Sequence, residues 1–413
     1  MSFRSVFIAI VVGFGLVLGA LIINSQRPQP EVNQPTVALV RAAGKCAECH
    51  AQLQHSIVHE YQLSAHATKN VSCLDCHQPA AGQEKTDHHS FVISKTVTSA
   101  NCRSCHESIY QQFLRSRHAA PSWAAVYGEK GLSAEQVAFS EKYHPGACKR
   151  AANSLVGLEG AAAMDAGCAK CHAIGKPNAD GTIGTCTACH TRHTSSVAIA
   201  RLPTTCGQCH MGPDHSQLEI FNESKHGLMF AAQQEMLKLD ADPKTLSTRD
   251  MFIPTCATCH MSGLNGLHMT HDTTERLSYW LFAEVSEQRP NYVRGQETMK
   301  EVCSQCHTRP TVEKVYKEAE AVVVATNEKV KAAKDIMTGL QKDGLLGKQP
   351  FATPLDFQYF DLWHYYGRTA KHGAFMGGAD FSQWHGNYPL LSHMVEIQHQ
   401  AEELRRKKDA ASK

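Results

Sequence analysis

The sequence lacks the marks of several common protein classes. Its net charge at neutral pH is only +2 over 413 residues, and no basic run indicates a nucleic acid as partner. Alternating strand patterns are scarce, and no unit recurs at a constant spacing as in a solenoid. Only one cysteine, Cys148, stands outside a single short motif. These absences leave a mainly helical chain with much irregular coil, organised around that motif.

The motif is CxxCH, and it occurs eight times. Two thiols three residues apart can form thioethers with a porphyrin, and the adjacent histidine can ligate its iron. Zinc is the alternative, but it needs groups of four ligands and gives no reason for a histidine at a constant offset. The sequence therefore predicts eight covalent c-type hemes. Their attachment residues are Cys46, Cys49 and His50; Cys73, Cys76 and His77; Cys102, Cys105 and His106; Cys168, Cys171 and His172; Cys186, Cys189 and His190; Cys206, Cys209 and His210; Cys256, Cys259 and His260; Cys303, Cys306 and His307.

The stretch 168–227 holds three of these motifs, and Asp214 and His215 follow the third of them. Two interpretations of this pair remain open. In the first, Asp214 caps a helix that begins at Ser216. In the second, His215 is a proton donor and Asp214 is the carboxylate that orients it over an open heme.

The N-terminus predicts export. Residues 6–23 form an uncharged apolar run behind Arg4, near the minimum length for crossing a bilayer. No A-x-A cleavage pattern follows, so an uncleaved signal anchor over residues 1–27 is favoured over a cleaved signal peptide. Arg4 then faces the cytoplasm, and the body lies on the periplasmic side of the cytoplasmic membrane. Residues 28–44, polar and rich in proline, form a linker.

The remainder divides into an octaheme cytochrome c domain over 45–310 and a helical region over 311–413. Helical patterns cover 109–118, 133–143 and 230–243, the last stopped near Pro243. Apolar residues from Val312 to Leu340 fall at helical spacing, with Gly344 as a stop. Two further helices are expected at roughly 355–372 and 388–408.

A heme that only transfers electrons is usually held by two axial ligands, so further histidines are needed. Seven histidines or histidine pairs lie in short polar or helical contexts near the motifs, and they leave one iron open for substrate. These predicted distal ligands are His66, His88 or His89 (His89 preferred), His118, His193, His226, His271 and His385. The other histidines are more simply explained as surface or core residues.

The segments GTCTACHTRH, CGQCHMGPDHSQLEIFNESKHG, CATCHMSGL and HGAFMGGADFSQWHGNY resemble the octaheme hydroxylamine oxidoreductase family over about residues 44–400. The resemblance implies a mostly helical homotrimer with three long C-terminal helices. It implies that the fourth heme, on Cys168, Cys171 and His172, is catalytic. It further implies that Asp214 and His215 match the distal acid/base pair of the family.

One departure bears on the direction of catalysis. Hydroxylamine-oxidising members have a tyrosine before QWHG that crosslinks to the catalytic heme of a neighbouring subunit, whereas this chain has Phe381. Members without the tyrosine resemble the reductive branch, which acts on nitrite and related nitrogen oxides. The expected electron donor is a membrane quinol-oxidising cytochrome or a periplasmic cytochrome c. Hydroxylamine oxidation and pure electron transfer are the alternatives.

Overall fold

The structure, a computed structural model, describes residues 14–15, 18–19, 44–213, 215–280 and 283–412. The expected signal anchor and linker, and Asp214, therefore lie outside the described residues, apart from Phe14, Gly15, Leu18, Gly19 and Gly44. Within the described ranges, no helix is both long enough and apolar enough to cross a membrane.

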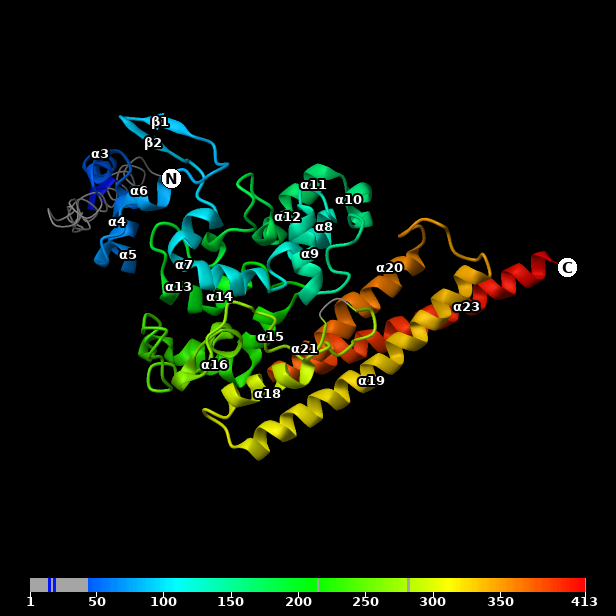
Figure 1. The fold of residues 1–413 in the computed structure, drawn as a ribbon. Coiled ribbons are helices and arrows are strands. Elements are labelled where there is room, and N and C mark those ends of the chain that lie inside the picture. Colours follow the sequence, from blue (N-terminus) through cyan, green and yellow to red (C-terminus); the bar gives the residue numbers. More distant parts are fainter. Residues whose placement is uncertain (1–13, 16–17, 20–43, 214, 281–282, 413) are drawn as a thin grey trace, which may run out of the picture.

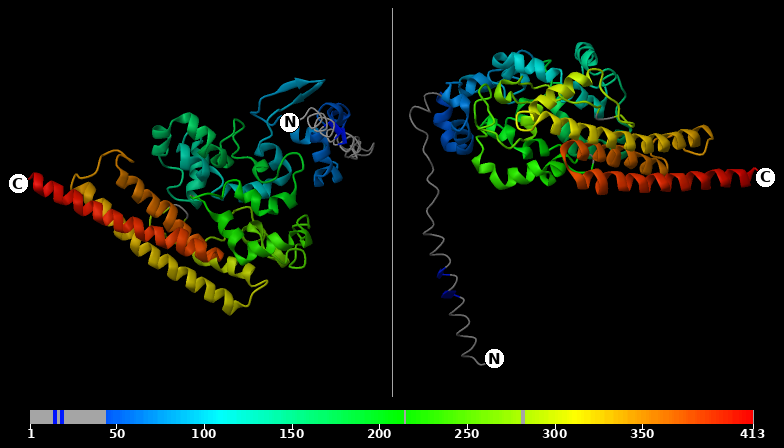
Figure 2. Two further views of the ribbon diagram at one scale, coloured as in Figure 1. Left: turned by 180° about the vertical axis from the view of Figure 1, so that it is seen from behind. Right: turned by 90° about the horizontal axis from the view of Figure 1, so that it is seen from below.

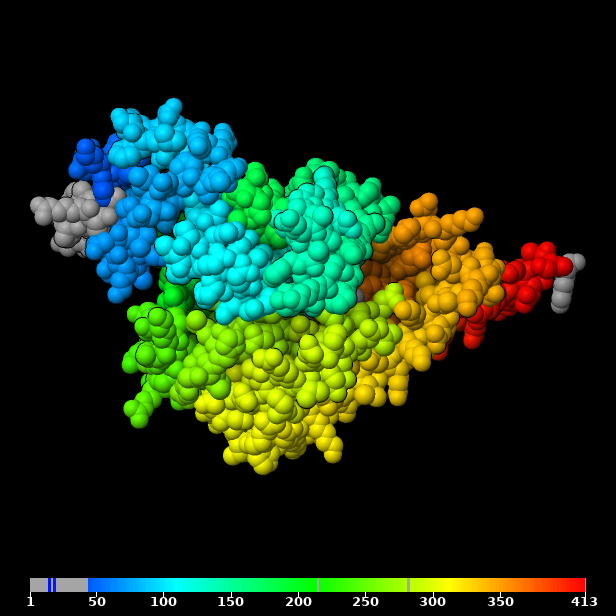
Figure 3. Space-filling model, viewed as in Figure 1, coloured from blue at the N-terminus to red at the C-terminus, as the bar shows by residue number. Residues whose placement is uncertain are grey.

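The chain forms a body of short helices, from which a group of long C-terminal helices extends at one end (Figures 1 and 3). The predicted mainly α fold is confirmed: the described residues contain many helices and one two-stranded sheet. The elements of the body are α3 (Lys45–Leu53), α4 (His55–Gln62), α5 (Ala65–Thr68), α6 (Cys73–His77), β1 (Thr86–His88), β2 (Phe91–Ile93), α7 (Ser99–Leu114), α8 (Ala120–Tyr127), α9 (Ala134–Tyr143), α10 (Ser154–Glu159), α11 (Ala161–Ala166), α12 (Cys168–His172), η1 (Ala173–Gly175), η2 (Cys186–Ala188), α13 (Val197–Arg201), α14 (Pro203–Gly207), α15 (Gln217–Glu223), α16 (Lys225–Gln233), η3 (Gln234–Met236), α17 (Cys256–His260), η4 (Leu264–Gly266) and α18 (Tyr292–Cys303).

Several CxxCH motifs are themselves short helices, because local capping starts a helix at the first cysteine. In α6, the Ser72 hydroxyl accepts a hydrogen bond from the Asp75 backbone N–H at 3.3 Å, and the Asp75 carboxylate accepts one from the Ser72 backbone N–H at 2.7 Å. Motif seven forms α17 with a capping box of Thr255 and Thr258, whereas motif four forms α12 behind Gly167 without a side-chain cap. One helical turn places residues i, i+3 and i+4 on the same face, so both thiols and the imidazole point the same way.

The strand pair was not expected from the sequence. β1 and β2 are antiparallel, and Thr86 pairs with Ile93 while His88 pairs with Phe91. His89 and Ser90 form the two-residue turn with φ angles of 45° and 70°, the left-handed region that such tight hairpins require. His88 therefore ends a strand, whereas His89 lies in the turn.

The helix expected over 230–243 was partly wrong. α16 ends at Gln233, η3 adds one short turn, and the chain is extended at Leu237. Leu237 joins a buried cluster of Phe221, Phe230, Leu246, Met251, Ile253 and Leu264. The Lys238 backbone N–H donates to the Asp250 carbonyl at 3.0 Å, so packing of the following loop ends the helix well before Pro243.

The C-terminal helices agree with the predicted pattern. α19 (Arg309–Lys342) is followed by α20 (Pro354–Asp361), η5 (Leu362–Gly367), α21 (Arg368–Met376), α22 (Ala379–Ser382), η6 (Gln383–Asn387) and α23 (Tyr388–Ala411). They lie side by side in both views of Figure 2. The buried residues of α19 follow one another at spacings of seven, four and three, which is the seam of a helix bundle. They are Val312, Ala319, Val323, Thr326, Val330, Ala333, Met337 and Leu340.

Two π-helical turns, η5 and η6, interrupt these helices, and η6 contains the QWHG sequence. Such turns are rare and are frequent at functional sites. Gly386 in η6 has no room for a side chain, because a Cβ there would lie 2.5 Å from the Phe381 carbonyl oxygen and 2.7 Å from the Cα of Ala370. This close approach fixes η6 against α21, the helix that faces the candidate site.

Candidate heme-binding and catalytic site

The motif histidines present one ring nitrogen for metal binding. In four of them Nδ1 lies within hydrogen-bond distance of an oxygen acceptor. These contacts are His50 to Gln54 Oε1 at 2.7 Å, His77 to the Ser94 carbonyl at 3.0 Å, His172 to the Ser122 carbonyl at 2.7 Å, and His210 to Gln217 Oε1 at 3.3 Å. A histidine that donates through Nδ1 leaves Nε2 unprotonated, which is the second-shell arrangement of metal-bound imidazoles. The residues therefore fit axial ligation of heme iron.

Six motif histidines also face a second imidazole. An iron–imidazole bond of about 2 Å on each side places the centroids of two rings that share one metal roughly 6 Å apart. The observed centroid distances are 6.0 Å for His50 and His88, 6.3 Å for His66 and His106, 6.5 Å for His77 and His193, 5.8 Å for His118 and His210, 6.4 Å for His190 and His271, and 5.9 Å for His226 and His307. These pairs have the spacing of two axial ligands on one iron.

Five of the predicted distal histidines lie in these pairs: His66, His118, His193, His226 and His271. The position of His193 is further fixed by Glu60, whose carboxylate accepts a hydrogen bond from the His193 backbone at 3.1 Å and lies 3.6 Å from its Nδ1. Histidines far apart in sequence are thus brought to the separation that a heme requires.

At the first motif, the preference for His89 does not match the structure. The ring opposite His50 is that of His88, and His89 lies beside His88 with ring centroids 4.6 Å apart. The physical reason is the hairpin register, which places His88 at the end of β1 and His89 in the turn. A sequence of two adjacent histidines does not reveal this register.

Separate substitution of the two neighbouring histidines tests this assignment. His88→Ala is expected to convert one low-spin heme to a high-spin heme, because His50 loses the imidazole opposite it. His89→Ala is the matched control and is expected to leave the spin state unchanged. The measurement is the low-spin intensity of the oxidised protein by electron paramagnetic resonance. A loss of low-spin signal in His89→Ala alone would reverse the assignment.

His385 is not opposite a motif histidine in the described part of the chain, contrary to the prediction. Its ring stacks on Phe381 with centroids 4.7 Å apart, and its Nδ1 lies 2.7 Å from an Asp380 carboxylate oxygen. The side chain is 57% exposed. The π-helical turn η6 places it on the surface of the C-terminal helices and away from the motif histidines.

The cysteines of successive motifs lie close to one another, and this gives the order of the sites in space. Burial and a thiol of another motif together raise the pKa of Cys73 (thiol of Cys46), Cys76 (Cys105), Cys102 (Cys186), Cys189 (Cys206), Cys206 (Cys256) and Cys259 (Cys303). Motif four joins this series as a branch, because Cys171 lies beside Cys209 of motif six. The sites thus form a continuous series with the fourth motif to one side.

His172 and His215 belong to one cluster of imidazoles. His215 lies with its ring centroid 5.8 Å from that of His210, and His172 is also within electrostatic reach of His210. Burial, with His210, His172 and His260 nearby, lowers the pKa of His118 to about 3. Cys171 Sγ donates to the Gln208 carbonyl at 3.8 Å. The structure thus brings motif four and His215 to the same region, while the contribution of Asp214 stays a prediction.

The segment after His215 is fixed by α21. Ser216 is the N-cap of α15, and its hydroxyl lies 3.3 Å from the Thr369 hydroxyl. The Gln217 amide nitrogen donates to His372 Nδ1 at 3.1 Å, while its oxygen faces His210. Gln217 thus connects a motif histidine to the C-terminal helices.

Sequence reasoning did not identify four supporting residues: Gln54, Ser122, Gln217 and His372. Gln54 follows its motif histidine by four residues, a helical spacing that could have indicated it. Ser122, 50 residues from His172 in sequence, contacts it through a backbone carbonyl, and no pattern of side chains predicts such a contact.

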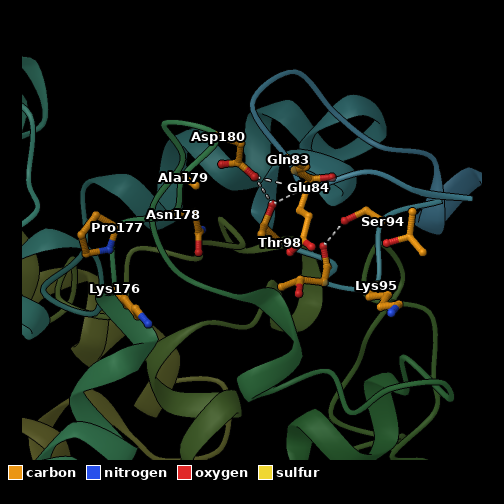
Figure 4. A pocket seen from close by; sticks show the side chains of 12 residues that line it. Gln83, Glu84, Ser94, Lys95, Thr98, Lys176, Pro177, Asn178, Ala179 and Asp180 are labelled. Carbon is orange, nitrogen blue, oxygen red and sulfur yellow. Dashed lines mark hydrogen bonds between the residues drawn. The ribbon is translucent and has the colours of Figure 1, made fainter. Parts of the chain in front are cut away.

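A cavity lies elsewhere, between the β1–β2 hairpin and residues 176–180 (Figure 4). It measures about 250 Å³. At its edge the Asp180 carboxylate accepts hydrogen bonds from Thr98 Oγ1 at 2.5 Å and Gln83 Nε2 at 3.0 Å. Hydrogen bonds from Thr182 and Thr98 hold the pKa of Asp180 below its usual value, against the effect of burial. This cavity contains neither His172 nor His215 and is distinct from the predicted catalytic region.

The zinc alternative finds no support in the part of the chain that the structure describes. No group of three or more histidine, cysteine, aspartate or glutamate side chains there is arranged to hold a bare metal ion. The recurring arrangement is instead two thiols and one imidazole on a helical turn, with a second imidazole across from it.

Comparison with known proteins agrees with this geometry. Residues 69–354 match a family model described as "Seven times multi-haem cytochrome CxxCH", and this range contains seven of the eight motifs. A probable nitrite reductase–hydroxylamine oxidoreductase fusion protein of Kuenenia stuttgartiensis is 26% identical over 265 residues. That match covers 56% of this chain but only 27% of the relative, so the chain corresponds to about a quarter of the fusion protein.

Two solved structures share the fold. A hypothetical multiheme protein superposes with a TM-score of 0.77 at 20% identity, covering 92% of this chain and 100% of the other. The Kuenenia stuttgartiensis reducing HAO-like protein complex superposes with a TM-score of 0.66 at 21% identity, covering 94% of this chain and 90% of the other. At these identities the likeness concerns the fold.

Proposed function

Because this chain belongs to the multi-haem cytochrome family with repeated CxxCH motifs, we propose that it is an octaheme oxidoreductase that reduces nitrite, or a related nitrogen oxide, to hydroxylamine or ammonia. The observation that carries the proposal is the branched arrangement of the sites. Motif four lies beside motif six, and His215 lies beside the motif-six histidine. A motif that lies beside the series and near a proton-donating side chain suits a catalytic site, whereas the remaining series suits electron delivery.

Eight covalent hemes are expected, one for each motif. The first motif lies outside the residues matched by the family model, but it has the same features as the others: His50 donates to Gln54 and faces His88. Mass spectrometry of the denatured chain is expected to give the polypeptide plus eight heme masses. A mass corresponding to seven hemes in the wild-type protein would refute the count, and Cys46→Ala with Cys49→Ala, which should lose one heme, provides the reference.

In this proposal the hemes supply electrons and, at one open iron, the position where the nitrogen oxide binds. His172 would hold that heme, because the Ser122 carbonyl accepts a hydrogen bond from its Nδ1 and leaves Nε2 as the nitrogen that would bind the iron. His215 is the proton donor to the departing oxygen. Asp214, by the family resemblance, orients His215. The packing of Ser216 and Gln217 against α21 fixes the backbone that carries His215.

Phe381 favours the reductive direction. A phenylalanine has no phenolic oxygen with which to form the crosslink of hydroxylamine-oxidising members of the resembled family. The Phe381 side chain is 8% exposed and stacks on His385 within its own chain. The wild-type protein is accordingly expected to run as a single chain on a denaturing gel.

Electron transfer without catalysis is the second candidate function, because six imidazole pairs and a continuous series of sites also suit a cytochrome that only conducts electrons, an electron wire. Electron paramagnetic resonance of the oxidised protein distinguishes the two. The enzyme is expected to show a high-spin heme whose signal changes when nitrite is added. A spectrum with low-spin signals for all eight hemes would favour the wire.

We further propose a homotrimer attached to the periplasmic face of the membrane by residues 1–27. Large apolar side chains are exposed along η6 and α23 at spacings of three and four, which is typical of a helix face that packs against another subunit. They are Trp384, Tyr388, Leu391 and Val395. Sedimentation of the detergent-solubilised protein tests the trimer, and N-terminal sequencing after membrane fractionation tests the anchor. A soluble monomer that begins after residue 23 would contradict both.

A further inference from the structure

Lys371 is a buried cation that forms no ion pair with a carboxylate of the described residues. Its side chain in α21 is 3% exposed, and its Nζ donates to the Ser286 hydroxyl at 2.9 Å and to the Trp280 carbonyl at 3.3 Å. Both acceptors are neutral, and no carboxylate of a described residue forms an ion pair with it. Burial lowers its pKa to about 7. Burying an ammonium group away from counter-charges is costly, so such groups persist mainly where the charge has a use.

The other deeply buried lysine of the described chain shows the usual arrangement. Lys300 is 6% exposed, and its Nζ lies 2.8 Å from a Glu313 oxygen and 3.2 Å from a Glu297 oxygen. These carboxylates raise the pKa of Lys300, although burial acts in the opposite direction. Its charge is therefore neutralised locally, whereas the charge of Lys371 is not.

Lys371 lies in the wall of the candidate catalytic region. The adjacent residue His372 accepts from Gln217, which in turn faces His210. Burial, together with Lys371, Arg368, His215 and His210, lowers the pKa of His372 well below its ordinary value. Lys371 and His215 thus both lie within electrostatic reach of the His372 imidazole.

The loop that faces Lys371 adds further positive charge. The guanidinium groups of Arg117 and Arg289 each lie 5.3 Å from the centroid of the Trp280 ring, and the Trp280 backbone carbonyl accepts from Lys371. The nearby carboxylate is Asp272, whose oxygen accepts hydrogen bonds from Thr274, with Arg289 in electrostatic reach. The Arg289 guanidinium and the Lys371 ammonium group thus both lie against Trp280, and positive charge of this kind favours a nearby anion.

We propose that Lys371 is a specificity-determining residue: its ammonium group near the His215 region makes the site select a small oxyanion of nitrogen over a neutral nitrogen compound. This inference rests on the proposed function and names its substrate class. Nitrite carries a negative charge at neutral pH, whereas hydroxylamine does not. A unit charge about 10 Å from a bound anion, at an effective dielectric constant of about 20, changes the affinity by roughly tenfold.

The test measures equilibrium binding to the heme-loaded protein and does not need turnover. Nitrite and azide are titrated into the oxidised protein, and carbon monoxide, a neutral ligand, into the reduced protein. In Lys371→Met the Kd for both anions is expected to rise about tenfold, while the Kd for carbon monoxide changes less than twofold. Ser286→Asp, which supplies a carboxylate to Lys371 without creating a cavity, is expected to have the same effect as Lys371→Met.

Lys334→Met is the matched control. Lys334, in α19, already pairs with Glu284 of the same loop at 2.6 Å, so this substitution is expected to leave all three affinities unchanged. Equal weakening of anions and carbon monoxide would mean that Lys371 only holds the loop in place, and unchanged anion affinity would also overturn the inference. A wild-type protein that binds carbon monoxide but neither anion contradicts the inference alone. One that binds none of the three contradicts the proposed function itself. If anion binding depends on Lys371 but the protein does not reduce nitrite, the inference about Lys371 is correct and the proposed reaction is wrong.

Discussion

His215→Ala is expected to lower the rate of nitrite reduction by about 10²–10⁴-fold, the usual loss when a general acid is removed. Reduction of a nitrogen–oxygen bond at neutral pH needs a proton at the departing oxygen. His215 follows motif six and lies beside its histidine, His210, and motif six adjoins motif four through Cys209 and Cys171. The backbone of this segment is fixed by Ser216 and Gln217, so the substitution removes the imidazole without freeing the loop.

Heme content should be unchanged in His215→Ala, because His215 is not assigned as a ligand. Asp214→Asn is expected to have a smaller effect in the same direction, through loss of the orienting carboxylate. His268→Ala is the matched control, since the imidazole of His268 lies at the surface, 3.7 Å from Glu275, and is expected to be dispensable. Wild-type turnover in His215→Ala would remove His215 from the mechanism.

Arg276→Met is expected to lower the free energy of unfolding by about 3–5 kcal/mol, because several buried acceptors lose their donor at about 1–3 kcal/mol each. The Arg276 side chain is 1% exposed and donates to three backbone carbonyls, those of Cys259 at 2.7 Å, Ser262 at 2.7 Å and His268 at 2.6 Å. Methionine keeps the apolar stem but makes none of these bonds, and the relief of burying a charge offsets only part of the loss.

Thermal unfolding of the heme-loaded protein measures this effect. Arg294→Met, on the exposed face of α18, is expected to change stability by less than about 0.5 kcal/mol. If Arg276→Met unfolds at the wild-type temperature, the Arg276 guanidinium does not stabilise the loop around motif seven.

The local features of this fold follow directly from the sequence. A CxxCH motif carries its own geometry, because one helical turn aligns both thiols and the imidazole whatever surrounds it. The long helix over 309–342 was predictable for a similar reason, since Val312, Ala319 and Val323 begin an apolar seam whose spacing is set by the helix alone. The short hairpin was missed because three-residue strands rich in polar residues give no alternating apolar pattern.

The pairing of residues distant in sequence was harder to predict, because tertiary packing decides it. The composition around His66, His118 and His226 identified them as predicted ligands, but not which motif each would face. The choice between His88 and His89 depended on a hairpin register, and the surface position of His385 depended on a π-helical turn. Lys371 has no sequence signature at all, because its significance comes from acceptors about 90 residues away.

The central claim is that this chain reduces nitrite, and anaerobic turnover of the purified protein with isotope-labelled nitrite tests it most directly. With a reduced low-potential dye as electron donor, the account predicts labelled hydroxylamine or ammonia, catalytic turnover in the wild type, and a loss of two to four orders of magnitude in His215→Ala. Oxidation of hydroxylamine by the same preparation, with no consumption of nitrite under reducing conditions, would contradict the account.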